Sequence, residues 1–273
     1  MKTVLITGCS SGIGYQTALL LREAGYRVLT TARHEADLKR LKVEGFEVFS
    51  LELADEGSVS RLLEAVLAAT QGSLDYLVSN ASYALPGAIE DLSRSELRAQ
   101  FEANVLGCVD LIQRFIPVMR QQGHGRIVQL SSILGIVTMP YRGAYCASKY
   151  AIESLGDALR MELKGSGIDF ILVEPGPIES HFRQNARLTF DEIFKQKTVS
   201  VHHANYQKLY QQQGKDIPFT LKPVAVARLI KKALESARPK ARYYVTFPAY
   251  FMMWSRRFLP TRILDWLMRT LGV

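Results

Sequence analysis

The fold is decided near the N-terminus, where the chain reads Val4-Leu5-Ile6-Thr7-Gly8-Cys9-Ser10-Ser11-Gly12-Ile13-Gly14. The β-branched apolar run predicts a strand, and the glycine-rich turn behind it predicts the start of a helix. We therefore expect a strand over Val4–Thr7 and a helix over Gly14–Ala24. The apolar run at residues 4–6 is too short for an export signal, whose core needs roughly 7–15 apolar residues.

Similar apolar runs recur along the 273-residue chain, which is 48% apolar and has no linker that divides it. The gaps between them can hold crossover helices, as is typical of parallel strands buried on both faces. The seven expected strands are Val4–Thr7, Arg27–Thr31, Glu47–Leu51, Tyr76–Ser79, Arg126–Leu130, Asp169–Val173 and Arg242–Thr246. The expected helices are Gly14–Ala24, Ser58–Thr70, Ser95–Gln121, Tyr145–Lys164 and Pro223–Ala237. The pattern predicts a single α/β domain over residues 1–273, of doubly wound Rossmann type, with a seven-stranded, mainly parallel sheet flanked by helices.

The glycine turn predicts a dinucleotide site. Gly8, Gly12 and Gly14 let the backbone turn tightly and approach a pyrophosphate, whose charge is stabilised by free N–H groups and the helix dipole. Ser10 and Ser11 can add hydroxyl donors. A turn without a ligand is the alternative, but the position between a strand and a helix favours the dinucleotide.

The end of the second expected strand selects between the two nicotinamide dinucleotides. A carboxylate there would bind the ribose hydroxyls of NAD, whereas this chain reads Thr30-Thr31-Ala32-Arg33-His34. Arg33 can contact a 2′-phosphate with two N–H groups, so NADP is the expected cofactor. The alternative is that Arg33 is an ordinary solvated surface charge.

A tyrosine and a lysine, Tyr145 and Lys149, share one face of an expected helix because they are four residues apart. An ammonium group beside a phenol favours the phenolate, so we expect the pKa of Tyr145 to fall towards neutrality and the phenol to exchange protons with a carbonyl or alcohol. A surface pair of no function is the alternative. Ser131 and Ser132, at the end of the fifth expected strand, can supply a hydroxyl that holds the substrate oxygen.

Together these features resemble the classical short-chain dehydrogenase/reductase family over essentially the whole chain. The motifs are Thr7-Gly8-x-x-x-Gly12-Ile13-Gly14, Asn80-Ala81, Asn104 in a Phe-x-x-Asn-Val-x-Gly setting, Ser132, Tyr145 with Lys149, and Pro175-Gly176-Pro177-Ile178-x-Ser180. The resemblance implies that Tyr145 is the catalytic acid/base and that Lys149 lowers its pKa and binds the nicotinamide ribose. It also implies that Ser132 positions the carbonyl oxygen and Asn104 holds a water of a proton relay, with no metal required.

The resemblance also implies a set of cofactor-binding residues. They are Gly8, Ser10, Ser11, Gly12, Ile13, Gly14, Arg33, Glu52, Leu53, Asn80, Ala81, Ser82, Tyr145, Lys149, Pro175, Gly176, Ile178 and Ser180. Three of them depart from the family pattern: Ser82 replaces a glycine, Glu52 an aspartate and Ser180 a threonine. None of these changes removes a catalytic group.

Within the family the chain resembles the NADP-preferring aldehyde, retinol, hydroxysteroid and acyl-dihydroxyacetone-phosphate reductases. The resemblance therefore implies an NADPH-dependent reductase of a hydrophobic aldehyde or ketone, in a homodimer or homotetramer. The alternative is a protein that binds NADP(H) to regulate a partner without turnover.

Two segments fall outside the alternation of strands and helices. Residues 183–218 form a long polar stretch, which we expect to be a lid over the substrate. Residues 247–273 form a basic, aromatic tail without the roughly 20 apolar residues of a membrane span. The tail can lie on an anionic membrane or close over an oily substrate, and the alternative is core or dimer packing.

Charge and cysteine content bear on the partners and the compartment. The chain has a formal net charge of +8, but residues 221–273 carry +9 and residues 1–220 carry −1. A nucleic-acid partner is therefore not expected, because the body of the chain lacks a basic face. Cys9, Cys108 and Cys146 show neither a disulfide nor a zinc pattern, which favours the cytoplasm, with membrane association left open for the tail.

Overall fold

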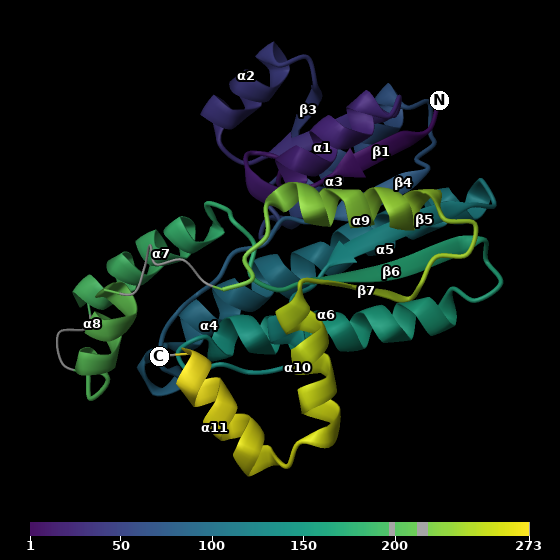
Figure 1. The fold of residues 1–273 in the computed structure, drawn as a ribbon. Helices are drawn as coiled ribbons and strands as arrows, with labels where there is room; N and C mark the ends of the chain where they lie inside the picture. The colour runs from purple at the N-terminus through teal and green to yellow at the C-terminus, as the bar shows by residue number, and fades with distance from the viewer. Residues whose placement is uncertain (197–199, 212–217, 273) are drawn as a thin grey trace.

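Within the residues that the structure describes, 1–196, 200–211 and 218–272, seven strands form one sheet in the order β3-β2-β1-β4-β5-β6-β7. The structure is a computed structural model (Figure 1). The strands are β1 (Thr3–Ile6), β2 (Arg27–Ala32), β3 (Glu47–Ser50), β4 (Tyr76–Ser79), β5 (Gly125–Leu130), β6 (Ile168–Pro175) and β7 (Arg242–Val245). Every neighbouring pair is parallel. The doubly wound α/β fold predicted from the sequence is confirmed.

Helices connect the strands. They are α1 (Gly12–Glu23), α2 (Glu35–Val43), α3 (Glu56–Ala69), α4 (Arg94–Phe101), α5 (Cys108–Gln121), α6 (Gly143–Glu162), α7 (Phe182–Gln196), α8 (His203–Gln211), α9 (Pro223–Glu235), α10 (Phe247–Phe258) and α11 (Thr261–Gly272). Short 3₁₀ turns lie at η1 (Ile89–Asp91) and η3 (Ile133–Gly135), and a π-helical turn, η2, spans Glu102–Gly107.

Two helical segments differ from the expectation. The sequence did not predict α2, because this helix is polar and buries only Leu41. The single helix expected over Ser95–Gln121 is instead α4 and α5 joined by the π turn η2. A π turn adds about one residue to a turn of the helix, and the apolar spacing on either side still indicates a helix, so the sequence does not reveal it.

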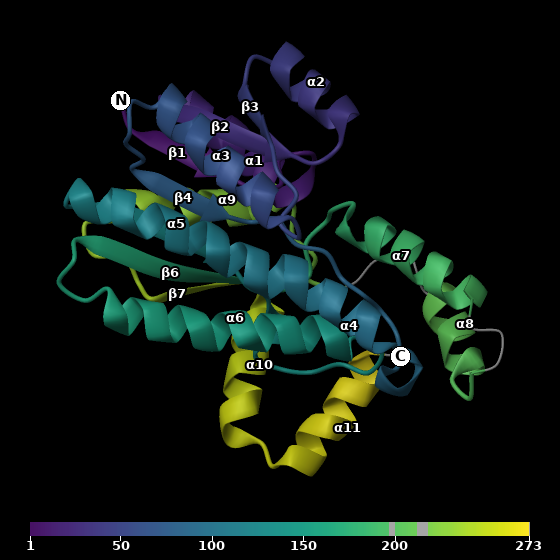
Figure 2. The same cartoon turned by 180° about the vertical axis from the view of Figure 1, so that it is seen from behind.

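The expected lid and tail both contain helices. The lid at residues 183–218 consists mainly of α7 and α8, although residues 197–199 and 212–217 lie outside the described part of the chain. The tail folds into α10 and α11, and Val273 lies outside the described residues. In both side views α7 and α8 lie beyond one end of the sheet, while α10 and α11 form a V next to α6 and β7 (Figures 1 and 2).

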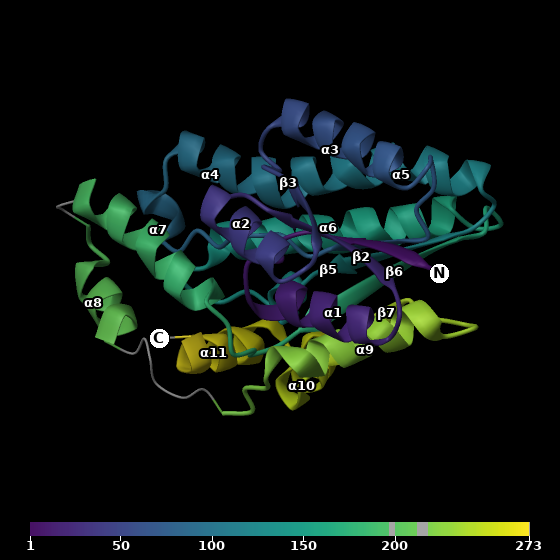
Figure 3. The ribbon, with the colours of Figure 1, turned by 90° about the horizontal axis from the view of Figure 1, so that it is seen from above.

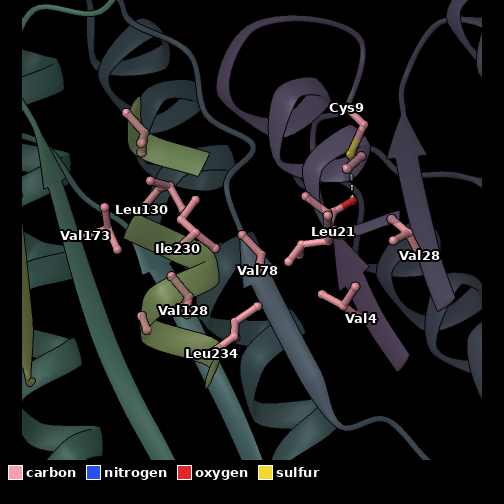
Figure 4. Close-up of a cluster of buried hydrophobic side chains, with 14 of the residues drawn as sticks. Val4, Cys9, Leu21, Val28, Val78, Val128, Leu130, Val173, Ile230 and Leu234 are labelled. Atoms are coloured by element: carbon pink, nitrogen blue, oxygen red, sulfur yellow. Dashed lines mark hydrogen bonds between the residues drawn. The ribbon is translucent and has the colours of Figure 1, made fainter. Parts of the chain in front are cut away.

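The sheet separates two apolar layers, because successive side chains of a strand point to opposite faces. On β1, Val4 and Ile6 join the layer beneath α1 and α9, whereas Leu5 joins the layer beneath α3, α5 and α6 (Figure 3). Figure 4 shows the first layer, where valines of five neighbouring strands meet Leu21 of α1 and Ile230 of α9. Both faces are therefore buried, which accounts for the near-continuous apolar runs of the strands.

A buried cluster of charges joins β6, β7 and α6. Arg242 lies 3.0 Å from Glu174, 3.1 Å from Glu153 and 2.8 Å from Asp157. Glu174 is fully buried, and its burial and the nearby charge of Glu153 raise its pKa well above the ordinary carboxyl range. Arg160 also pairs with Asp157, at 2.9 Å, but two arginines cannot neutralise three carboxylates, so Glu174 holds its proton at neutral pH.

This cluster predicts a pH-dependent stability. The unfolded chain loses the Glu174 proton near pH 4.5, whereas the folded chain keeps it through neutrality, so folding takes up a proton and the free energy of unfolding falls as the pH rises. We expect Glu174→Gln, which resembles the protonated acid, to remove up to about 1.4 kcal/mol of this fall per pH unit. Urea unfolding at a series of pH values measures the effect. Glu64→Gln, an exposed change on α3, is the control, and parallel curves for wild type and Glu174→Gln would contradict the prediction.

Candidate active site

The glycine turn after β1 is free of side chains where the backbone bends. Gly8 and Gly12 have φ angles of +70° and +60°, which favour glycine. A Cβ on Gly14 would lie 2.3 Å from the carbonyl oxygen of Gly8 and 2.6 Å from Asn80 Nδ2. The turn thus exposes backbone N–H groups at the start of α1, which is the geometry that holds a pyrophosphate.

Hydrogen bonds tie this turn to the end of β4. The Thr7 hydroxyl oxygen accepts from the backbone N–H groups of Asn80 and Ala81, both at 2.9 Å. Asn80 Nδ2 donates to the carbonyl oxygens of Thr7 at 2.9 Å and Gly8 at 3.1 Å. The Asn80 side chain therefore fixes the position of the turn, and Ser82 follows two residues later.

The ends of β2 and β3 lie side by side and carry Arg33 and Glu52. Their side chains form an exposed ion pair at 3.3 Å, and Glu52 Oε1 also accepts from the N–H of Ala54 at 3.1 Å. Leu53 is buried, and its carbonyl packs so closely that a Cβ on Gly107 would lie 1.9 Å from it. Arg33 is thus accessible at the strand end, where the adenosine half of a dinucleotide would bind.

Tyr145 and Lys149 are both buried on α6. Lys149 Nζ donates to the carbonyl oxygen of Leu130 at 2.9 Å and lies 5.7 Å from the centre of the Tyr145 ring. Burial lowers the pKa of Lys149 to about 8, partly offset by the charge of Glu153. The lysine is therefore held at the carboxyl end of β5, next to the tyrosine.

The protonation of Tyr145 differs from the expectation. Burial raises the pKa of Tyr145 above its ordinary value, and the hydrogen bond with Ser132 and the charge of Arg142 oppose this rise only in part. The predicted fall towards neutrality is thus wrong for this structure, because desolvation of the phenolate outweighs the nearby positive charges. At neutral pH the site presents a protonated phenol.

The two serines after β5 have different surroundings. Ser132 bonds with Tyr145, and its hydroxyl oxygen also accepts from the N–H of Leu134 at 3.1 Å. Ser131 lies beside Glu153. Burial raises the pKa of Glu153, and the contact with Ser131 partly offsets this rise. Ser132 is therefore the serine next to the tyrosine.

Asn104 lies in the π turn η2 and is buried. Its Oδ1 accepts from the N–H of Tyr83 at 3.0 Å, while Nδ2 donates to the Tyr83 carbonyl at 2.8 Å and to Ser148 Oγ at 3.2 Å. Ser148 in turn donates to the carbonyl oxygen of Tyr145 at 2.7 Å. Asn104 thus links the segment after β4 to the helix of the tyrosine, and its role in a proton relay stays a prediction.

The segment from Pro175 to Ser180 passes close to the glycine turn. A Cβ on Gly176 would lie 2.1 Å from Thr246 Oγ1, and a Cβ on Gly12 would lie 3.3 Å from Ser180 Cβ. Ile178 pairs with Leu221 in a parallel bridge. Of the predicted cofactor residues in this segment, Ser180 therefore lies next to the glycine turn, whereas Gly176 lies against Thr246, at the end of β7.

Apolar side chains surround Tyr145. The Phe182 ring at the start of α7 lies 5.6 Å from the Tyr145 ring. The buried cluster around the tyrosine comprises Ile133, Leu134, Val137 and Cys146 with Ala249, Met252, Leu264 and Met268 of the tail helices. The tail thus contributes to the wall of the site.

The segment expected to be a lid, at residues 183–218, contacts the body of the domain through α8. Tyr206 Oη accepts from the N–H of Ala88 at 2.8 Å and donates to Asp91, and the Phe190 and Tyr206 ring centres are 5.1 Å apart. Asn205 Nδ2 donates to Tyr141 Oη at 2.6 Å. These contacts hold α8 against the segment between β4 and α4 and against the segment that precedes α6, while the Phe190–Tyr206 contact joins α7 to α8.

Four side chains that the sequence motifs do not assign to the site also shape it: Thr7, Arg40, Ser148 and Phe182. Thr7 stands directly before Gly8 and Ser148 directly before Lys149, so their positions in the sequence could have identified them as site residues. Arg40 Nη2 donates to the Ser10 carbonyl at 2.6 Å, and neither this contact nor that of Phe182 has a sequence signal, because tertiary packing creates both. In the part of the chain that the structure describes, no three His, Cys, Asp or Glu side chains gather as metal ligands.

Comparison with known proteins agrees with this geometry. The sequence profile of the short chain dehydrogenase family matches residues 2–190. The chain is 40% identical over 264 residues to the uncharacterized oxidoreductase YbbO of Escherichia coli strain K12, covering 97% of this chain and 93% of YbbO. It is 31% identical over 275 residues to human 17-beta-hydroxysteroid dehydrogenase type 1, covering 94% and 78% of the two chains.

A solved structure shares the fold. The short chain dehydrogenase/reductase from Burkholderia phymatum in complex with NAD aligns with a TM-score of 0.79 at 24% identity, covering 100% of this chain and 96% of that chain. The same arrangement of sheet and helices thus holds a nicotinamide dinucleotide in that protein.

The tie between β1 and β4 predicts a cost for Thr7→Val. The substitution keeps the shape but leaves the N–H groups of Asn80 and Ala81 without their acceptor, so we expect a loss of about 1–3 kcal/mol in the free energy of unfolding. Thr17→Val is the matched control, because the equally buried Thr17 hydroxyl only donates to the Ile13 carbonyl. Equal losses in the two variants, measured by denaturant unfolding, would show that the Thr7 tie has no special role.

Proposed function

The chain belongs to the short chain dehydrogenase family, and from this membership we propose that it is an NADPH-dependent reductase of hydrophobic aldehydes or ketones. The observation that carries the proposal is the grouping of Ser132, Tyr145 and Lys149 at the carboxyl end of β5, beside the bare glycine turn. A hydroxyl, a protonated phenol and an ammonium group together can bind and protonate a carbonyl oxygen.

The residues present fit a nicotinamide dinucleotide. The N–H groups at the glycine turn would hold the pyrophosphate, and Lys149 would bind the ribose near the nicotinamide. Arg33 supports NADPH over NADH, because it is exposed at the end of β2 and its guanidinium can pair with a 2′-phosphate. When bound, the cofactor supplies a hydride to the carbonyl carbon.

The proton comes from the chain. Ser132 would donate a hydrogen bond to the substrate's carbonyl oxygen, and Tyr145 would give its phenolic proton to that oxygen, which becomes the hydroxyl group of the alcohol product. Because burial keeps Tyr145 protonated at neutral pH, the site is suited to reduction. Lys149, whose pKa is about 8, is mostly an ammonium ion at neutral pH, and this positive charge would stabilise the Tyr145 phenolate that proton transfer leaves.

The substrate class follows from the walls of the site. Phe182, Met252, Leu264 and other apolar side chains surround Tyr145, so a polar substrate would lose hydrogen bonds to water without replacement. A relative that this chain matches over 78% of that protein's length is named a 17-beta-hydroxysteroid dehydrogenase, and a steroid is largely hydrocarbon. We therefore infer an apolar chain or ring next to the carbonyl group.

Tyr145→Phe tests the chemistry. The substitution removes the proton donor and should lower kcat for carbonyl reduction roughly 10²–10⁴-fold. Tyr150→Phe is the matched control, because Tyr150 is on the same helix and its hydroxyl bonds to the Ile136 carbonyl instead. The assay follows NADPH oxidation with short and long aldehydes, retinal and steroid ketones. Full turnover by Tyr145→Phe would contradict the assignment, and NADPH binding without turnover of any carbonyl would support the regulatory alternative.

Arg33→Gln tests the cofactor. Loss of the guanidinium should raise KM for NADPH about tenfold or more and leave KM for NADH nearly unchanged, since NADH lacks the 2′-phosphate. Arg61→Gln, which removes an exposed arginine paired with Asp55, is the control. Steady-state kinetics with both cofactors would refute the NADPH preference if the two KM values changed in parallel.

A further inference from the structure

Helix α10 exposes a stripe of aromatic side chains. Phe247, Tyr250, Phe251, Trp254 and Phe258 are all exposed. At 3.6 residues per turn they fall within an arc of roughly 100°. The Phe247 and Phe251 rings stack at 6.3 Å between centres, and those of Trp254 and Phe258 stack at 5.3 Å. The stripe is therefore continuous along the helix.

The second tail helix extends this surface. Ile263, Trp266 and Leu271 of α11 are exposed, whereas Leu264 and Met268 of the same helix are buried in the cluster around Tyr145. Phe219, before α9, lies with its ring 5.4 Å from that of Phe247 and is also exposed. A continuous exposed surface of large apolar side chains on two neighbouring helices is typical of a site that contacts another molecule.

The charges on the same helices indicate the partner. Arg256, Arg257, Arg262 and Arg269 are exposed on α10 and α11, against one acidic residue, Asp265. In the described part of the chain none of these four arginines forms an ion pair. Two copies of the surface placed face to face would bring net +3 against net +3, whereas anionic lipid headgroups would complement it.

We propose that α10 and α11 form a peripheral docking surface for an anionic lipid membrane, with the aromatic stripe in the headgroup region and the arginines against lipid phosphates. Tryptophan and tyrosine favour this boundary because they have an apolar body and a polar atom. No described helix is long and apolar enough to cross a bilayer. Exposed aromatic rings and exposed arginines on the same two helices suit an arrangement in the plane of the membrane surface.

The docking surface has a consequence for the substrate, which rests on the proposed carbonyl reduction. The buried faces of the two helices, with Met252, Leu264 and Met268, pack in the cluster that contains Tyr145. Lipid and tyrosine are thus separated by about one helix diameter, roughly 10 Å. A lipid-dissolved aldehyde or ketone would reach the site without passing through bulk water.

The two tryptophans provide the test. The chain has two, Trp254 and Trp266, and both lie on this surface with exposed fractions of 54% and 62%. With vesicles of phosphatidylcholine and phosphatidylserine we expect the intact protein to show a blue-shifted emission, quenching by brominated lipid and co-sedimentation. Pure phosphatidylcholine vesicles should bind at least about tenfold less, and added salt should weaken binding.

Variants separate the contributions of charge and apolar contact. Arg262→Glu with Arg269→Glu, on the side of α11 that carries Trp266, should lower binding to the anionic vesicles about tenfold or more, while Arg94→Glu with Arg98→Glu, the same charge change on α4, should have little effect. Phe247→Ser, Phe251→Ser and Phe258→Ser combined should abolish the blue shift. The far-ultraviolet circular dichroism and the reduction of a short water-miscible aldehyde should remain as in the wild type.

Other results overturn the proposal. Unchanged emission and sedimentation with anionic vesicles would refute it. Concentration-dependent dimers in light scattering, lost in the triple serine variant and without vesicle binding, would assign the surface to a second copy of the chain. Vesicle binding by a protein that reduces no carbonyl would leave the docking surface intact and refute the proposed function alone.

Discussion

The bonds between the ends of β1 and β4 constrain the whole site. The strand order reverses at these neighbours, since β2 and β3 lie on one side of β1 while β5, β6 and β7 lie beyond β4. Thr7 and Asn80 close this point with four hydrogen bonds, which hold the glycine turn against the segment that leads to Tyr83. From Tyr83 the contacts continue through Asn104 and Ser148 to the backbone of Tyr145. The cofactor turn and the tyrosine are thus positioned by one continuous network.

The sequence predicts the sheet well because both of its faces are buried. Seven apolar runs indicate the strands. The glycine turn follows the end of β1, and the Tyr145–Lys149 pair on α6 lies next to the end of β5, so these two motifs indicate which end of the sheet holds the candidate site. What the sequence does not show depends on tertiary context. Helix α2 buries one leucine, η2 disturbs the periodicity by a single residue, and the pKa of Tyr145 depends on how completely its neighbours exclude water. The helices of residues 183–218 are not predicted, because they are polar, and the role of this segment as a lid stays a prediction.

The adjacent serines after β5 contact two different groups of residues. Ser132 forms a hydrogen bond with Tyr145, whereas Ser131 contacts Glu153, one of the acids that pair with Arg242. Arg242 is the first residue of β7, the strand that leads to Thr246 and the tail, and Thr246 lies against Gly176. The charge cluster therefore fixes where the tail leaves the sheet and, with it, the apolar wall of the site.

Helix α10 has apolar side chains on two faces: Ala249 and Met252 are buried against the domain, and the aromatic stripe is exposed. A helix of this kind has few positions that are free to vary, since a substitution that rotates or shifts it alters both faces at once. A change in the apolar wall around Tyr145 is then accompanied by a change in the exposed aromatic stripe. Divergence in this protein's lineage should accordingly change the apolar wall around Tyr145 and the exposed aromatic stripe in step, while the glycine turn and the tyrosine helix stay fixed.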